Sequence, residues 1–202
     1  NKLNLKASEF AIPNEFNSLI EGFGGTGVNA FTSNDIIAYV SQFPSHQTQK
    51  WLSINSHRFE NPVFRLFQSE LETVYEEKNR SMDNAFRMLF EQFFANFFRQ
   101  HPYGQQTILG TKEHLKNPSI KKMKEYYDTY YISNNMTLML AGNFDLKLTK
   151  EEIKNTFGKL KSGPDPKFVD VKEMPFNGRE VVSKRLTPIR FGMIGFRVPP
   201  PR

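Results

Sequence analysis

The chain has 202 residues, 38% hydrophobic and 24% charged, without cysteine, which is typical of a globular protein and excludes disulfides and thiolate chemistry. No apolar run reaches the roughly 18 residues of a transmembrane helix, so we expect no membrane span. The net charge of +6 comes with lysines mixed among glutamates, as on solvated helix faces, and we therefore expect no nucleic-acid partner.

The first third of the chain predicts a short helix, two strands and a second helix. In chain order, we expect these elements within residues 13–27, 28–32, 36–43 and 46–59. Turn-forming residues Ser33–Asp35 join the two strands. Pro44 stops the second strand, and Ser45 is the expected N-cap of the helix that follows.

The rest of the chain predicts mainly helices and then strands. We expect helices over residues 63–99 with a break at 82–84, over 118–131 and over 149–158, and strands over 136–141, 181–186 and 191–198. Asn117 before a proline and the capping box at Thr149 mark two helix starts. Phenylalanines spaced by three and four from Phe86 to Phe97 are expected to pack in the core, and 101–104 is expected to be a loop.

These elements add up to an α+β fold, with helices layered on an antiparallel or mixed sheet. We expect the helix over 118–131 to bury one apolar face, formed by Ile120, Met123, Tyr127 and Tyr130.

The chain shows no complete metal site by local spacing. Its four histidines do not pair, and neither H-E-x-x-H nor H-x-x-E-H occurs. Glu70 and Glu77 are seven residues apart in a predicted helix, so they point the same way. Such a pair can hold a metal, with one carboxylate as ligand and the other orienting the site. On residue types alone, a solvated acidic helix face is the stronger interpretation.

Four motifs, taken in order, change this balance. They are the GVNAFTS strand at 27–33, the E-x-x-x-x-x-x-E helix at 70–77, the HPYG loop with ILG at 101–110, and the segment from YY at 126 to AGNFD at 141–145. Their order and spacing resemble those of the insulinase/pitrilysin family of zinc peptidases, of the inverzincin type, over nearly the whole chain. By this resemblance the chain is a partial peptidase domain. Residues 1–116 are the half with the metal site, and 117–202 are the second half of the repeat and the start of the next lobe.

The resemblance implies a zinc-dependent endopeptidase. Glu77 is then the third zinc ligand, and Glu70 is the carboxylate that orients the site. The family takes its other two ligands and its catalytic base from H-x-x-E-H on an upstream helix, which we expect to precede Asn1. We accordingly expect the intact protein to bind zinc and these 202 residues alone to lack it, because catalytic zinc usually needs three protein ligands. The alternative within the same fold is a non-catalytic subunit, a peptide-binding protein or an assembly partner.

The same resemblance suggests how a substrate binds. A peptide or unfolded polypeptide adds as an extra strand to the NAFT segment, and Asn29, Ala30 and Phe31 are the candidate contacts. The other interpretation of Phe31 is simple core packing.

Further expected partners are the remaining lobes of the same protein or a homologous subunit. Residues 1–7 show no signal peptide, and the resemblance alone suggests a periplasmic or secreted protein. A basic peptide- or nucleic-acid-binding domain unrelated to peptidases is the second alternative.

Overall fold

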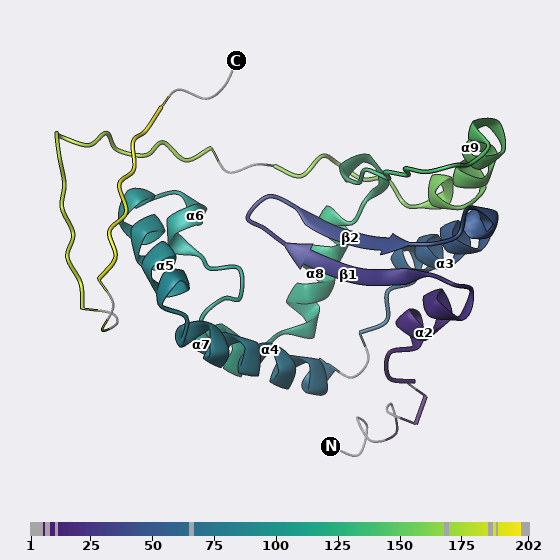
Figure 1. The fold of residues 1–202 in the computed structure, drawn as a ribbon, viewed down its shortest axis with the longest axis horizontal. Helices are drawn as coiled ribbons and strands as arrows, with labels where there is room; N and C mark the ends of the chain where they lie inside the picture. The colour runs from purple at the N-terminus through teal and green to yellow at the C-terminus, as the bar shows by residue number, and fades with distance from the viewer. Residues whose placement is uncertain are drawn as a thin grey trace. The chain divides into compact units, whose positions relative to one another are not determined.

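The computed structural model describes residues 6, 9–10, 12–64, 67–167, 170–185, 188 and 190–198, without the side chains of 68 and 69. The chain forms two units, one from residues 1–67 and 119–168 and the other from 68–118 and 169–202. Most of the described elements are helices, and two strands form an antiparallel sheet (Figure 1). The predicted α+β class is confirmed.

The first unit opens with the elements that the sequence predicts. They are α2 (Glu15–Gly22), β1 (Thr26–Thr32) and β2 (Ile37–Gln42). The strands pair with Ala30 opposite Tyr39. Ser33 closes the turn between them, because its backbone N–H donates to the Ile36 carbonyl at 2.8 Å and its hydroxyl accepts the Ile36 N–H at 3.1 Å. The polar turn residues thus satisfy their own backbone, as expected for this turn chemistry.

The core of the first unit lies where α2 and the sheet pack on α3 (Thr48–Glu60). Ile20 of α2 and Leu52 of α3 are fully buried. Trp51 stacks on Phe43 with ring centroids 4.7 Å apart, and its indole N–H donates to the Ser41 hydroxyl at 2.8 Å. The aromatic pair therefore joins α3 to the end of β2 while its polar atom stays satisfied.

The remaining elements are distributed between the two units. The first unit also holds α8 (Ile120–Tyr130), α9 (Leu146–Asn155) and the short 3₁₀ helices η1 (Ser45–Gln47), η2 (Ser133–Asn135) and η3 (Phe157–Lys159). The second unit holds α4 (Phe67–Met82, from its second residue), α5 (Ala85–Phe97), α6 (Pro102–Gln105) and α7 (Lys112–Lys116). The predicted break at 82–84 separates α4 from α5, and Asn84 caps α5 by accepting the Arg87 N–H at 3.0 Å.

Three predicted helix starts are wrong. Ser45 does not cap α3 with its side chain but begins η1. The N-caps of α8 and α9 are Ser119 and Asp145, whose side chains accept backbone N–H groups at 3.2 and 2.8 Å. The prediction had placed them at Asn117 and Thr149. Serine and aspartate are both preferred N-cap residues, and here they cap α8 and α9. Thr149 instead lies buried inside α9.

Two local predictions between 101 and 118 also need correction. The expected loop 101–104 contains the short helix α6, in which proline occupies the first turn and His101 Nδ1 accepts the Tyr103 N–H at 3.2 Å. Proline at this position suits a helix start because its missing N–H is not needed there. Helix α7, which we did not predict, begins at Lys112, directly after its N-cap Thr111.

The three later strands are not formed within the described residues. Residues 136–141, 181–185 and 191–198 are not assigned to a ladder, and Leu186 lies outside the described residues. Within the first of these segments, Leu138 and Leu140 still pack against the core while Met139 is exposed. This alternation is that of a strand, but a strand also needs a partner for its backbone groups.

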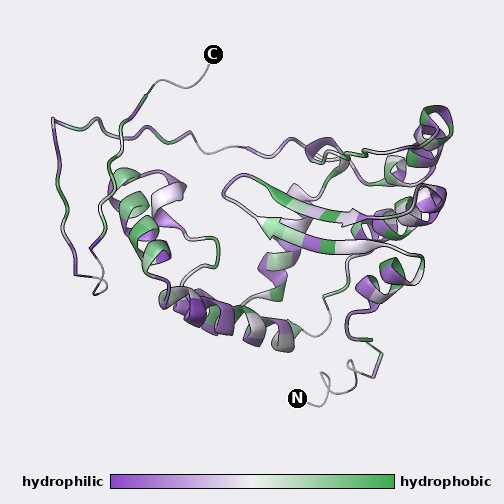
Figure 2. Ribbon diagram, viewed as in Figure 1, coloured by the Kyte–Doolittle hydropathy of each residue, from purple (hydrophilic) through white to green (hydrophobic). Residues whose placement is uncertain are grey.

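The predicted buried faces of α5 and α8 are also not buried in the described structure. Phe86 and Phe90 are about half exposed, and so is Ile120 at the start of α8. Figure 2 shows that α5 is largely hydrophobic whereas α4 is mainly hydrophilic. Spacing determines which side chains share a face, whereas burial depends on a neighbouring element that the spacing does not reveal.

Burial raises the pKa of three tyrosines of the first unit, Tyr126, Tyr127 and Tyr131. The Tyr127 hydroxyl donates to the Phe59 carbonyl at 2.7 Å, and the hydroxyls of Tyr131 and Tyr39 are 2.9 Å apart. Burial raises the pKa of Tyr127 to about 12, and burial with the Tyr39 hydrogen bond raises the pKa of Tyr131 further. Unfolded tyrosine has a pKa of about 10, so the folded state favours the neutral phenols.

We therefore expect the free energy of unfolding to be fully retained below about pH 10 and to fall as the pH rises towards 12. Urea denaturation at several pH values between 9 and 12 measures this slope. In Tyr127→Phe, which removes one of the three phenols with a raised pKa, the slope should become shallower. An identical slope in the variant and the parent chain would show that Tyr127 does not carry the effect.

Candidate metal site

Helix α4 presents one exposed face that carries both predicted carboxylates. Residues 67–82 contain neither proline nor glycine and include several strong helix formers. Glu70, Thr73, Glu77 and Arg80 follow spacings of three, four and three, and all four are exposed. The prediction that Glu70 and Glu77 lie on one helix is confirmed, and their seven-residue spacing puts them on one face of it.

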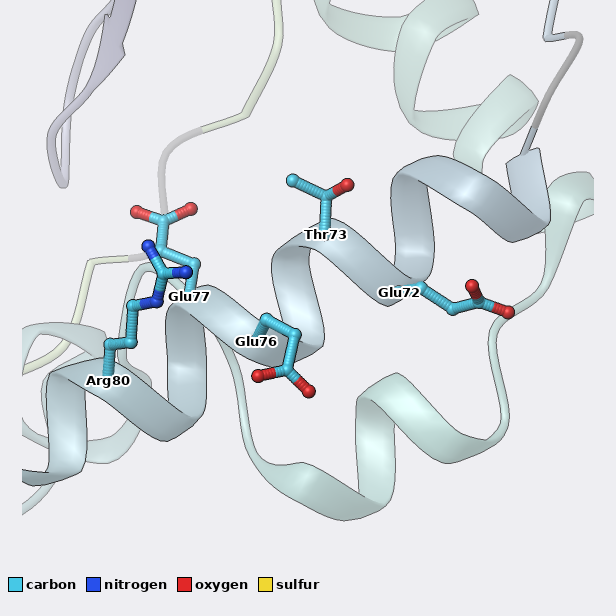
Figure 3. Close-up of a pocket in the computed structure, with 5 residues that line it drawn as sticks. All are labelled: Glu72, Thr73, Glu76, Glu77 and Arg80. Carbon is cyan, nitrogen blue, oxygen red and sulfur yellow. The ribbon is translucent and has the colours of Figure 1, made fainter.

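The neighbouring glutamates leave the helix in other directions. Figure 3 shows Glu77, Thr73 and the guanidinium group of Arg80 on one side of α4, while Glu72 and Glu76 project from another side. The same five residues line an open hollow of about 550 Å³. The hollow therefore presents three carboxylates and one guanidinium group along a single helix.

The donor set on α4 fits one part of a zinc site. A glutamate oxygen is an ordinary zinc ligand, and exposed Glu77 can serve as one. Glu70 lies two turns away, about 10 Å along the axis, so it reaches the same ion only through an intervening group. Among the residues that the structure describes, no three side chains of histidine, aspartate or glutamate are grouped to hold a metal.

Two of the four histidines have structural tasks. His101 caps α6, and His114 closes the capping box of α7 with Thr111. His46 lies in η1 and His57 lies exposed in α3. In the described structure the four histidines are therefore capping or surface residues.

The packed side of α4 contains a residue that sequence reasoning missed. Lys78, directly after Glu77, is only 7% exposed. Its Nζ lies 3.7 Å from the Glu91 Oε1 of α5, and Arg87 Nε lies 3.5 Å from the same oxygen. The spacing of Lys78 and Glu91, 13 residues apart across a helix break, gives no local signal of this pair.

The substrate-contact candidates lie on β1, in the first unit. Ser33 and Ile36 form a hydrogen-bonded pair, and antiparallel pairs alternate, so the backbone of Ala30 points away from β2. In agreement, the Ala30 N–H donates to the Asn29 Oδ1 at 2.8 Å instead of to a strand. Phe31 is 55% exposed, so core packing does not describe it in this structure.

Comparisons with known proteins agree with the zinc-peptidase class that these features suggest. Residues 119–202 match the family model described as the peptidase M16 inactive domain. Residues 1–112, more than half of the chain, match the model of the insulinase family, peptidase family M16. The chain belongs to this family.

Curated relatives carry the same assignment in their names. Zinc protease PqqE of Helicobacter pylori is 27% identical over 205 residues, which cover 98% of this chain and 46% of that protein. A protein of Rickettsia felis named as a zinc protease is 25% identical over 164 residues, which cover 80% of this chain and 39% of that protein. The chain thus spans less than half the length of these relatives.

Solved structures show the fold. A protease from Helicobacter pylori superposes with a TM-score of 0.67 at 28% identity, over 80% of this chain and 38% of that one. The first half of the periplasmic protease PqqL from Escherichia coli gives a TM-score of 0.64 at 22% identity, over 76% of this chain and 35% of that one. In the part of the chain that is described, no helix is long and apolar enough to span a membrane.

Proposed function

We propose that this chain is part of a zinc-dependent endopeptidase in which Glu77 is a zinc ligand. The observation that carries the proposal is the exposed face of α4, where Glu77 and Glu70 lie two turns apart in a chain that belongs to the insulinase family. Relatives named zinc protease support the choice of metal. The division of the chain at residues 116 and 117 into two halves stays part of this proposal.

The residues of this chain would hold the metal from one side. Glu77 supplies a charged oxygen, and Glu70 orients the site through a ligand that another segment of the intact protein contributes. The chemistry that a zinc ion would supply there is Lewis acidity, which would lower the pKa of a water molecule and polarise the scissile carbonyl. The remaining ligands and the catalytic base come from outside the described residues.

The outer edge of β1 receives the substrate in this proposal. An extended peptide can pair with the outward backbone of Ala30, which replaces the local hydrogen bond to the Asn29 side chain. The side chains of Ala30 and Phe31 lie on opposite faces of β1, and the exposed ring of Phe31 can contact a substrate side chain. Because main-chain pairing does not depend on the substrate's side chains, it would allow peptides and unfolded polypeptides of many sequences to bind.

The intact protein contains further lobes, or pairs with a homologous subunit, that complete the enzyme. The short span of the chain relative to its relatives supports this part of the proposal. We also propose a periplasmic or secreted location, which rests on the description of PqqL as periplasmic.

Removal and return of the metal test the proposed function. The intact protein should hydrolyse an unfolded polypeptide, lose this activity with a zinc chelator and regain it when zinc is added back. Hydrolysis that survives the chelator would contradict a zinc peptidase. A protein that neither binds zinc nor cleaves peptides would instead be the non-catalytic relative.

A further inference from the structure

A buried lysine lies next to the proposed zinc ligand. Lysine is almost never buried without a partner, yet Lys78 is 7% exposed. Its ammonium group lies 3.7 Å from Glu91 on α5, which Arg87 also contacts. Arg87 already accompanies Glu91, so Lys78 is not needed merely to neutralise that carboxylate.

Lys78 holds the end of α4 that carries Glu77. Among the described side chains of α4, the buried ones are Lys78 and Ser81, both in the last two turns. The Ser81 hydroxyl donates back to the Lys78 carbonyl at 2.7 Å. That hydrogen bond stays within α4, so the contact that joins this end of the helix to α5 is the ion pair of Lys78 with Glu91, whereas Glu77, about 100° around the helix, points outward.

A small rotation of α4 matters for a metal ligand. A side-chain end about 6 Å from the helix axis moves by about 2 Å when the helix turns by about 20°. Functional sites need their groups placed within about 0.5 Å and 10–20°. An ion pair that fixes the rotation of α4 against α5 thus fixes the direction of Glu77 as well.

We propose that Lys78 is a positioning residue that aims Glu77 at the zinc, through its ion pair with Glu91. This inference rests on the proposed function of Glu77. A well-packed apolar side chain usually stabilises a fold as well as a buried ion pair does, so stability alone gives no reason for a lysine here. Orientation of the helix gives such a reason.

Zinc affinity in the intact protein, measured by competition with a chelator, tests the proposal when the melting temperature is recorded in parallel. Lys78→Met keeps the volume and removes the charge, and it should weaken zinc binding about 3- to 10-fold with an unchanged or higher melting temperature. Glu91→Gln should weaken zinc binding similarly. The variant that carries both Lys78→Met and Glu91→Gln should bind zinc no less tightly than the single variant with the lower zinc affinity. Lys78→Arg should keep most of the affinity. Lys116 is an exposed lysine on α7, and Lys116→Met is the control, which should keep the wild-type zinc affinity.

Two results would overturn the positioning role. One is wild-type zinc affinity in Lys78→Met while Glu77→Gln loses it. The other is a loss of affinity that simply follows a loss of melting temperature, because a merely structural lysine would give that result. An intact protein without zinc binding, or with normal binding in Glu77→Gln, would overturn the proposed function itself, and the role of Lys78 with it.

Discussion

Glu77→Gln should nearly abolish zinc binding and peptide hydrolysis in the intact protein. The neutral amide is a much poorer ligand than the carboxylate, and a catalytic zinc usually has three protein ligands, so losing one leaves an incomplete site. We expect activity to fall by more than about 100-fold, beyond the range found for residues that only support a ligand. The measurements are a chelator-sensitive cleavage assay and the zinc content of the purified variant.

Three other glutamates on α4 make the test specific. Glu70→Gln should cost about 10- to 100-fold, because Glu70 lies on the same face but two turns away. Glu72→Gln and Glu76→Gln should be tolerated, because these side chains leave the helix in other directions (Figure 3). If Glu77→Gln were as active as the wild type, or if all four variants lost activity equally, the ligand assignment would be refuted.

Local signals predicted most of the longer helices and placed Glu70 and Glu77 together on one helix. The carboxylates at 70 and 77 share a face because a helix repeats nearly twice in seven residues, and this follows from sequence alone. The break at 82–84 also has a local cause, since Asn84 caps the next helix with its own side chain. The hairpin of β1 and β2 follows from alternation and from the turn at Ser33.

Features that depend on a distant segment could not be predicted in this way. The phenylalanine stripe of α5 has the spacing of a core face, yet Phe86 and Phe90 are about half exposed. Lys78 shows the opposite difference. A lysine on an acidic helix is expected to be exposed to solvent, whereas the structure buries it near Glu91. The three wrong helix starts are a milder case, in which two or more polar residues compete for one cap.

The interpretation of the β1 edge needs both the local sequence motif and the strand pairing that the structure shows. The motif around Asn29 and Phe31 indicated a substrate strand, but only the register of the hairpin shows which backbone groups point outward. Ala30 lies opposite Tyr39, and its N–H donates to a neighbouring side chain rather than to β2. A variant that removes this single N–H therefore separates substrate pairing from folding.

Ala30→Pro should lower kcat/KM for peptide substrates by about 10-fold or more while the hairpin still forms. Proline lacks the N–H group, and it is tolerated in an edge strand when that group faces away from the ladder. A substrate strand would lose one main-chain hydrogen bond, worth about 1 kcal/mol, and would also meet the proline ring. Steady-state kinetics and the melting temperature of the variant measure the two effects separately.

Two substitutions provide the controls for this experiment. Ala30→Ser keeps the N–H group and should retain nearly wild-type kinetics. Phe31→Pro removes an N–H group that faces β2, and it should destabilise the hairpin itself. The proposed substrate edge would be wrong if Ala30→Pro folded normally and cleaved peptides at the wild-type rate. In that case the outward backbone of β1 would not pair with the substrate, whatever the role of Glu77.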